Sequence, residues 1–141
     1  MIGRIDHVGY LAGDLEGAAS SMCERLGVPI VKRFERPQFD LVGIYLGEGH
    51  AGIEIFTFTD PDLLGRRLGD APMRLDHVAY EVADIEAVCA ELRGRGVRFC
   101  GPDNREEMPG PVDLGGTLHV WTVPETSCGQ SMQLMQLPTS S

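Results

Sequence analysis

The stretch RIDHVGY at residues 4–10 decides the fold, because it returns as RLDHVAY at residues 74–80. An Asp and a Glu follow each copy at the same distance, at residues 14 and 16 and at residues 84 and 86. A second echo, at a different offset, joins GIEIFTF at residues 52–58 to SMQLMQL at residues 131–137. The sequence therefore indicates one domain over residues 1–141 built from an internal repeat, with modules at 3–59 and 73–138.

Each copy is predicted to run as a strand, a helix and three further strands. Residues 3–11 alternate with the period of a strand, which places His7 on a definite face. Asp14 and Asp84 are predicted to cap helices over residues 15–26 and 85–95. The other predicted strands cover residues 30–34, 39–46, 52–58, 74–82, 97–100, 117–123 and 131–137, with a turn at 47–50 and a short helix around 63–68. The predicted fold class is α+β, with two tandem βαβββ modules.

Residues 101–116 form a connection rich in Gly, Pro and acidic residues, and it lacks an apolar period. Connections in compact domains are usually shorter than about 12–15 residues when they have no structure of their own. Two interpretations stay open at this point: a lid over a site, or a disordered surface excursion.

The composition excludes several classes of protein. The chain has 141 residues, of which 43% are hydrophobic and 23% charged, which is typical of a soluble globular protein. A net charge of -9 and a single lysine, Lys32, argue against nucleic acid as a partner. We expect no membrane partner and a cytoplasmic location, since there is no apolar run of about 18 residues and no signal-peptide pattern. Cys23 and Cys89 lie on predicted helices and are interpreted as small buried apolar residues.

Four potential metal ligands lie at equivalent places in the two modules. Each module alone is a small open sheet with one bare face, and it cannot bury enough apolar area to be stable by itself. We therefore expect the two modules to pair as a curved mixed sheet around a cleft. Residues His7, Glu54, His77 and Gln133 would then converge.

This arrangement resembles the vicinal oxygen chelate superfamily. The stretches that carry the resemblance are DHVG at 6–9, IEI at 53–55, DHVA at 76–79 and MQL at 132–134. The nearest pattern is similar to methylmalonyl-CoA epimerase and glyoxalase I. The resemblance implies a divalent ion, Co, Ni, Mn, Fe or Zn, and the side chains that would hold it are His7, Glu54, His77 and Gln133. It also implies a homodimer, because relatives commonly complete their clefts by pairing.

The chemistry that the resemblance implies is that of a metal-dependent isomerase, epimerase or lyase. Such an enzyme works through an enolate-like intermediate on a small oxygenated substrate, an acyl-CoA or a natural product among them. The candidate catalytic residues are Glu54 as ligand and base, Gln133, and Glu81 on the His77 face of its strand. Epimerases of this type carry a further glutamate before the third strand, where this chain has Gln38 and Asp40.

Two other functions of the same superfamily stay open. A protein that binds or sequesters a small molecule would line its cleft with apolar and aromatic side chains, and the candidates are Phe39, Phe56, Phe58, His119, Trp121 and Met135. These side chains are also interpretable as core, and His119 as an outer partner of a ligand or as a base. A dioxygenase would need two His and one carboxylate. In that branch the carboxylate comes from the last strand, where this chain has Gln133.

Overall fold

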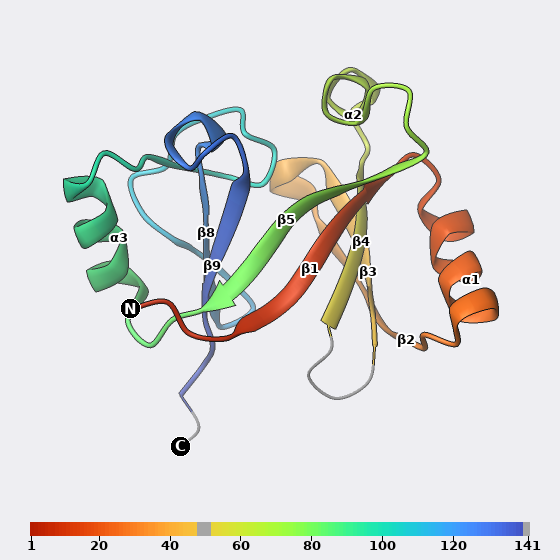
Figure 1. Ribbon diagram of the computed structural model, residues 1–141, viewed down its shortest axis with the longest axis horizontal. Coiled ribbons are helices and arrows are strands. Elements are labelled where there is room, and N and C mark those ends of the chain that lie inside the picture. The colour runs from red at the N-terminus through yellow and green to blue at the C-terminus, as the bar shows by residue number, and fades with distance from the viewer. Residues whose placement is uncertain (48–51, 140–141) are drawn as a thin grey trace. The chain divides into compact units, whose positions relative to one another are not determined.

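The computed structural model describes residues 1–47 and 52–139, and the chain divides into two compact units (Figure 1). The first unit is His7–Asp76, and the second unit is Met1–Asp6 together with the chain from His77 onward. The N-terminal residues belong to the second unit because the Gly3 amide donates to the Glu81 carbonyl at 2.8 Å, and the Glu81 amide donates to the Arg4 carbonyl at 2.9 Å. These limits differ from the predicted modules, which began at residues 3 and 73.

The first unit contains a four-stranded mixed sheet in the order β2-β3-β4-β1. β1 is parallel to β4, and the other neighbours are antiparallel. The elements are β1 (Ile5–Ala12), α1 (Leu15–Leu26), β2 (Ile30–Arg36), η1 (Pro37–Phe39), β3 (Leu41–Leu46), β4 (Gly52–Phe58) and α2 (Pro61–Leu68). The strand predicted from Phe39 begins instead at Leu41, because a 3-10 turn that starts with a proline precedes it. Residues 48–50 of the predicted turn lie outside the described residues.

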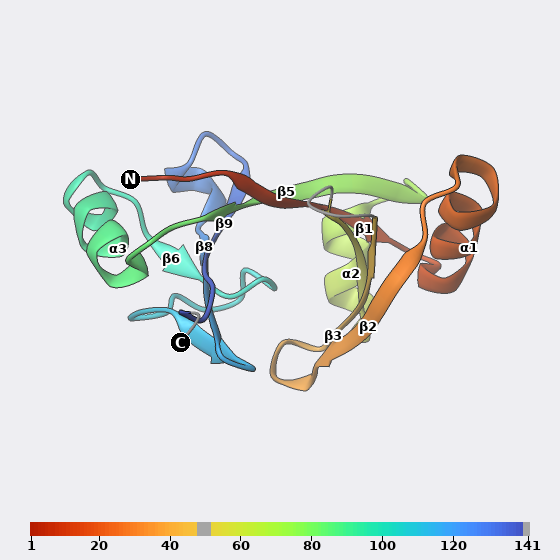
Figure 2. The same cartoon turned by 90° about the horizontal axis from the view of Figure 1, so that it is seen from below.

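Two helices cover opposite faces of this sheet (Figure 2). Helix α1 begins where the Asp14 carboxylate accepts from the Gly17 amide at 3.0 Å, and it ends at Gly27, whose φ is 67°. It packs on Ile44 and Ile55. Helix α2 packs on the other face of the sheet, where the side chains of β1 and β4 that point away from α1 lie. The helix and this face form a core cluster of Leu11, Leu41, Phe56, Phe58, Leu63 and Leu68.

The second unit repeats this plan with one additional strand. Its elements are β5 (Met73–Glu81, which starts in the first unit), α3 (Ile85–Gly94), β6 (Phe99–Cys100), β7 (Val112–Leu114), β8 (Thr117–Thr122), η2 (Pro124–Thr126) and β9 (Ser131–Gln136). The strand order is β5-β9-β8-β6, and β7 pairs with β8. Helix α3 lies on this sheet (Figure 1) over a core that includes Val88, Phe99, Val120 and Leu134. The predicted α+β class is confirmed.

The first and last strands of each unit pair in the same register. In the first unit His7 lies opposite Gly52 and Gly9 opposite Glu54. In the second unit His77 lies opposite Ser131, and Ala79 lies opposite Gln133. Both pairings are parallel, and each extends over five residue pairs. The two echoes in the sequence, with their different offsets, therefore mark equivalent positions of the fold.

The segment 101–116 was predicted to lack structure of its own, and that prediction is wrong. Val112–Leu114 forms β7 and turns back into β8 through Gly115 and Gly116, whose φ values are 68° and 95°. The Asp113 carboxylate accepts from the Gly116 amide at 2.7 Å. Asp103, near the start of the segment, is buried. The segment is thus attached to its unit, which rules out the disordered excursion, while the lid remains a prediction.

The α-helices are short. Within the described ranges, none of the helices has the length and apolar character needed to cross a membrane.

The two cysteines on predicted helices differ in burial. Cys89 on α3 is buried as predicted, and burial raises the pKa of its thiol. Cys23 on α1 is exposed, so the predicted burial is wrong there. Its position lies outside the apolar stripe of the helix, which includes Ala18, Ala19 and Met22.

Candidate metal centre

A buried imidazole and carboxylate meet on the sheet of the first unit. His7 Nε2 lies 3.2 Å from a carboxylate oxygen of Glu54, and their side chains are 0% and 8% exposed. The contact follows from the register, because His7 lies opposite Gly52, two residues before Glu54, so that both side chains occupy the same face of neighbouring parallel strands. A carboxylate at this depth requires a cationic or hydrogen-bonding partner. These two atoms are also ligand types that first-row divalent ions accept.

Tyr45 holds the other side of the His7 ring. Its hydroxyl lies 3.4 Å from His7 Nδ1, and the two rings meet edge to face with centroids 5.3 Å apart. Tyr45 lies opposite Glu54 on β3. The imidazole therefore presents Nε2 to Glu54 and Nδ1 to Tyr45. Tyr45 was not among the predicted site residues, because the pairing of β3 with β4 that brings it beside Glu54 cannot be inferred from strand period alone.

The second unit buries the corresponding His and an amide. His77 and Gln133 are only 4% and 3% exposed. Gln133 Nε2 lies 2.8 Å from His119 Nδ1 on the neighbouring strand β8. Trp121 stacks on His119 with ring centroids 5.8 Å apart and planes inclined by 10°. Of the predicted site residues, the structure thus brings Gln133, His119 and Trp121 together.

Glu81, a predicted base, is engaged by an arginine. Its two carboxylate oxygens lie 2.7 and 3.0 Å from the Arg4 guanidinium. This pairing raises the pKa of Arg4. A paired arginine stabilises the ionised form of a carboxylate and so makes it a weaker base. The backbone pairing of residues 3 and 4 with Glu81 creates this contact, and periodicity within a single strand does not reveal it.

The predicted apolar lining is largely core. Phe56 and Phe58 are 1% and 3% exposed, and they meet edge to face with centroids 5.6 Å apart beneath α2. Phe39 is partly buried and packs against the same cluster. Met135 is 5% exposed and lies opposite His119 on the Gln133 face of β9. These side chains form an apolar surround for buried polar groups, and they offer little surface themselves.

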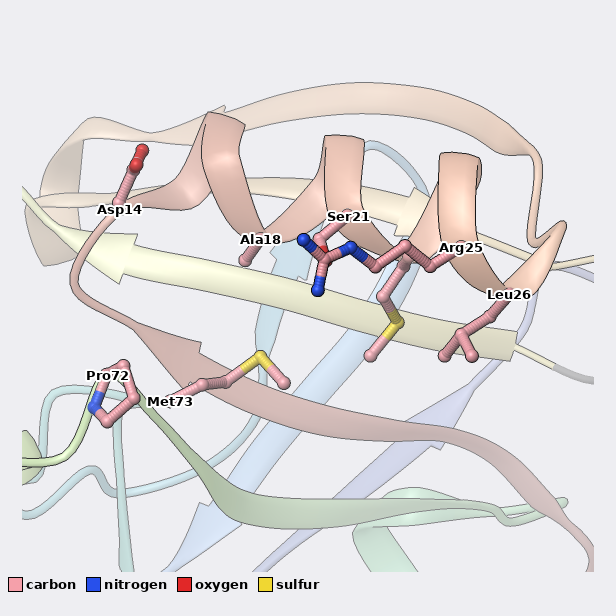
Figure 3. A pocket seen from close by; sticks show the side chains of 8 residues that line it. Asp14, Ala18, Ser21, Arg25, Leu26, Pro72 and Met73 are labelled. Atoms are coloured by element: carbon pink, nitrogen blue, oxygen red, sulfur yellow. The ribbon is translucent and has the colours of Figure 1, made fainter.

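A separate groove of about 450 Å³ lies on the first unit (Figure 3). Side chains of α1 and of the segment leading into β5 line it: Asp14, Ala18, Ser21, Met22, Arg25, Leu26, Pro72 and Met73. None of the predicted ligands or lining residues is among them. The groove is therefore distinct from the buried His7 and Glu54 pair.

Comparison with known proteins gives a family and several relatives. A family model described as the Glyoxalase/Bleomycin resistance protein/Dioxygenase superfamily matches residues 6–110. An ethylmalonyl-CoA/methylmalonyl-CoA epimerase of Cereibacter sphaeroides is 29% identical over 103 residues, which cover 72% of this chain and 77% of that protein.

Solved structures of methylmalonyl-CoA epimerases share the fold. One is 26% identical with a TM-score of 0.77, and the match covers 96% of this chain and 95% of the other. A variant of the Streptomyces coelicolor epimerase in complex with 2-nitronate-propionyl-CoA is 19% identical with a TM-score of 0.83. That match covers 99% of this chain and 100% of the other.

Proposed function

Because the chain belongs to the glyoxalase/bleomycin resistance protein/dioxygenase superfamily, we propose that it is a metal-dependent epimerase that moves the proton beside a thioester carbonyl. The observation that carries this proposal is the buried contact of His7 with Glu54, 3.2 Å long. The second unit repeats its two positions, in the same register, as His77 and Gln133. An isolated buried carboxylate is costly, and one buried beside an imidazole is a candidate for a functional site.

The residues that would hold the metal are His7, Glu54, His77 and Gln133. Two imidazoles, one carboxylate and one amide oxygen carry a formal charge of -1 and suit Co, Ni, Mn, Fe or Zn. All four side chains are buried, which fits ligands better than solvated surface groups. A bound divalent ion would act as a Lewis acid that stabilises negative charge developing on a carbonyl oxygen.

Glu54 is the group that we assign to proton transfer. It is the one carboxylate among the four proposed ligands, and Gln133 at the equivalent position cannot accept a proton under ordinary conditions. The apolar cluster around Phe56 on the same face limits water near this carboxylate. Gln38 cannot act as a second base for the same chemical reason, so Asp40 is the remaining carboxylate between β2 and β3.

The substrate class that we propose is an acyl-CoA thioester with an acidic proton on its α carbon. The support comes from the relatives, whose names specify ethylmalonyl-CoA and methylmalonyl-CoA. The proton between two carbonyl groups of such a compound is removable by a carboxylate once the developing charge is stabilised.

The test is hydrogen exchange with the solvent. Protein purified without a His tag is loaded with Co²⁺ and incubated with methylmalonyl-CoA in D₂O, and mass spectrometry follows the substrate. We expect one deuterium to enter the substrate, and we expect chelation of the metal to stop this exchange.

Glu54→Gln should keep the metal and lower the exchange rate by about 10²–10⁴, the usual contribution of a positioned base. Glu86→Gln, a matched change on the exposed face of α3, should leave the exchange unchanged. If none of the five metals supports exchange, the proposal is overturned.

A second candidate function is binding of a flat small molecule without turnover. The observation that favours it is the parallel stack of His119 on Trp121, an aromatic layer at the Gln133 face of β8. Tight ligand binding that persists after His7→Ala and after chelation would support this function over the enzyme.

A further inference from the structure

We propose that His119 is a positioning residue that fixes which end of the Gln133 amide faces the proposed metal. This inference rests on the proposed function, since it assumes that Gln133 is a ligand. It assigns to His119 a contact with the ligand and no contact with the substrate.

The need for such a residue follows from the chemistry of an amide. The two ends of a Gln side chain have nearly the same shape, but only the carbonyl oxygen can bind a cation. Gln133 Nε2 lies 2.8 Å from His119 Nδ1, within hydrogen-bonding distance. Because the amide nitrogen can only donate, Nδ1 must accept, so the imidazole is neutral and carries its proton on Nε2. In this state His119 holds the NH₂ end, and the carbonyl end is turned to the other side.

The imidazole itself is held in place. Trp121 stacks on it with nearly parallel planes, and both residues are buried. His119 also lies in the middle of three strands, opposite Val112 on β7 and opposite Met135 on β9. A ring that is fixed by packing on its face and by strands on both sides can specify an amide orientation.

The first unit provides a built-in comparison. Gly43 lies opposite Phe56 as His119 lies opposite Met135, so the two residues occupy equivalent positions beside Glu54 and Gln133. A carboxylate has two acceptor oxygens and can bind a cation through either, whereas an amide has one. The unit with the carboxylate has a glycine at this position, with the Phe34 ring against it. The unit with the amide has the histidine.

The experiment measures Co²⁺ affinity of the metal-free protein by calorimetry. His119→Ala should weaken binding about 10- to 100-fold, as loss of a residue that orients a ligand commonly does. His119→Asn, whose carbonyl oxygen can replace Nδ1 as acceptor, should restore most of the affinity. In a Gln133→Glu protein the same His119→Ala change should cost less than about threefold, because a carboxylate needs no orientation. Circular dichroism confirms that each variant is folded.

The outcomes separate this inference from the proposed function. If the unchanged protein does not bind Co²⁺, both fail. If it binds and His119→Ala binds equally well, the inference alone fails. The inference also fails alone if His119→Ala weakens binding by the same factor in the Gln133→Glu protein as in the protein that keeps Gln133. Should His119→Ala not fold, the imidazole ¹⁵N spectrum of the unchanged metal-free protein decides: a proton on Nε2 supports the inference, and a proton on Nδ1 overturns it.

Discussion

The two units share a backbone register but surround their buried proposed ligands with different side chains. Glu54 of the first unit corresponds to Gln133 of the second, and the flanking residues Gly43 and Tyr45 correspond to His119 and Trp121. The first unit supports its histidine through the Tyr45 hydroxyl, and the second supports its amide through an imidazole. The two copies of the repeat thus place the proposed ligands at equivalent positions, while the residues that contact them differ.

This difference gives the two units different chemical capacities. The first unit holds a carboxylate, which can both bind a cation and carry a proton. The second holds an amide, which can only bind through its oxygen. We therefore expect proton transfer to depend on the first unit, and metal affinity to depend on both.

The largest effect that tests the equivalence of the units is expected for His77→Ala. Loss of this proposed ligand should remove the metal and reduce exchange at least about a hundredfold, because Lewis-acid stabilisation is worth several kcal/mol. Metal analysis and the deuterium assay measure both quantities. Leu75→Ala, an exposed change on the same strand, is the control and should alter neither. Loss of the folded circular dichroism spectrum in His77→Ala would instead assign His77 a purely structural role.

The next effect concerns the position at which Gly43 and His119 differ. A Cβ atom at Gly43 would lie 2.3 Å from the Phe34 ring, so Gly43→Ala should lower the free energy of unfolding by about 1–3 kcal/mol. Denaturant titration measures the change. Gly65→Ala in α2, where a Cβ meets open space, is the matched control and should raise stability by about 0.5–1 kcal/mol. If the two substitutions change the free energy of unfolding equally, the Phe34 ring is not what restricts residue 43 to glycine.

The smallest effect tests the part of the repeat that did not diverge. Asp14 accepts from the Gly17 amide at 3.0 Å, and Asp84 accepts from the Ala87 amide at 3.1 Å. Asp14→Ala and Asp84→Ala should each lower the free energy of unfolding by about 1 kcal/mol, the typical contribution of an N-cap. Thermal and denaturant unfolding measure both. A difference of more than about 1 kcal/mol between them would show that the two helices contribute unequally to their units.

Features with a local cause were predictable from the sequence. The caps at Asp14 and Asp84 and the stop at Gly27 are specified by neighbouring residues, and the structure has all three. The strand at 52–58 begins and ends where its apolar alternation does. The repeat also predicted that His7 and Glu54 converge, and in the structure their side chains share a face of neighbouring strands.

Features that arise from tertiary pairing were not predictable in the same way. The contact of Arg4 with Glu81 joins residues 77 positions apart, so strand period alone does not reveal it. Strand β7 has only three residues, too few for a periodic signal, and it exists because it pairs with β8. The Tyr45 contact with His7 depends on the order of β3, β4 and β1. Each of these contacts requires knowledge of which strands are neighbours.

The most direct test of the account is the position of a metal in a crystal grown with Zn²⁺. The account predicts one ion per chain, with anomalous signal about 2.0–2.2 Å from His7 Nε2, from a carboxylate oxygen of Glu54, from the His77 imidazole and from the Gln133 carbonyl oxygen. An ion bound elsewhere, or no ion while His7 and Glu54 stay 3.2 Å apart as a pair, would contradict it.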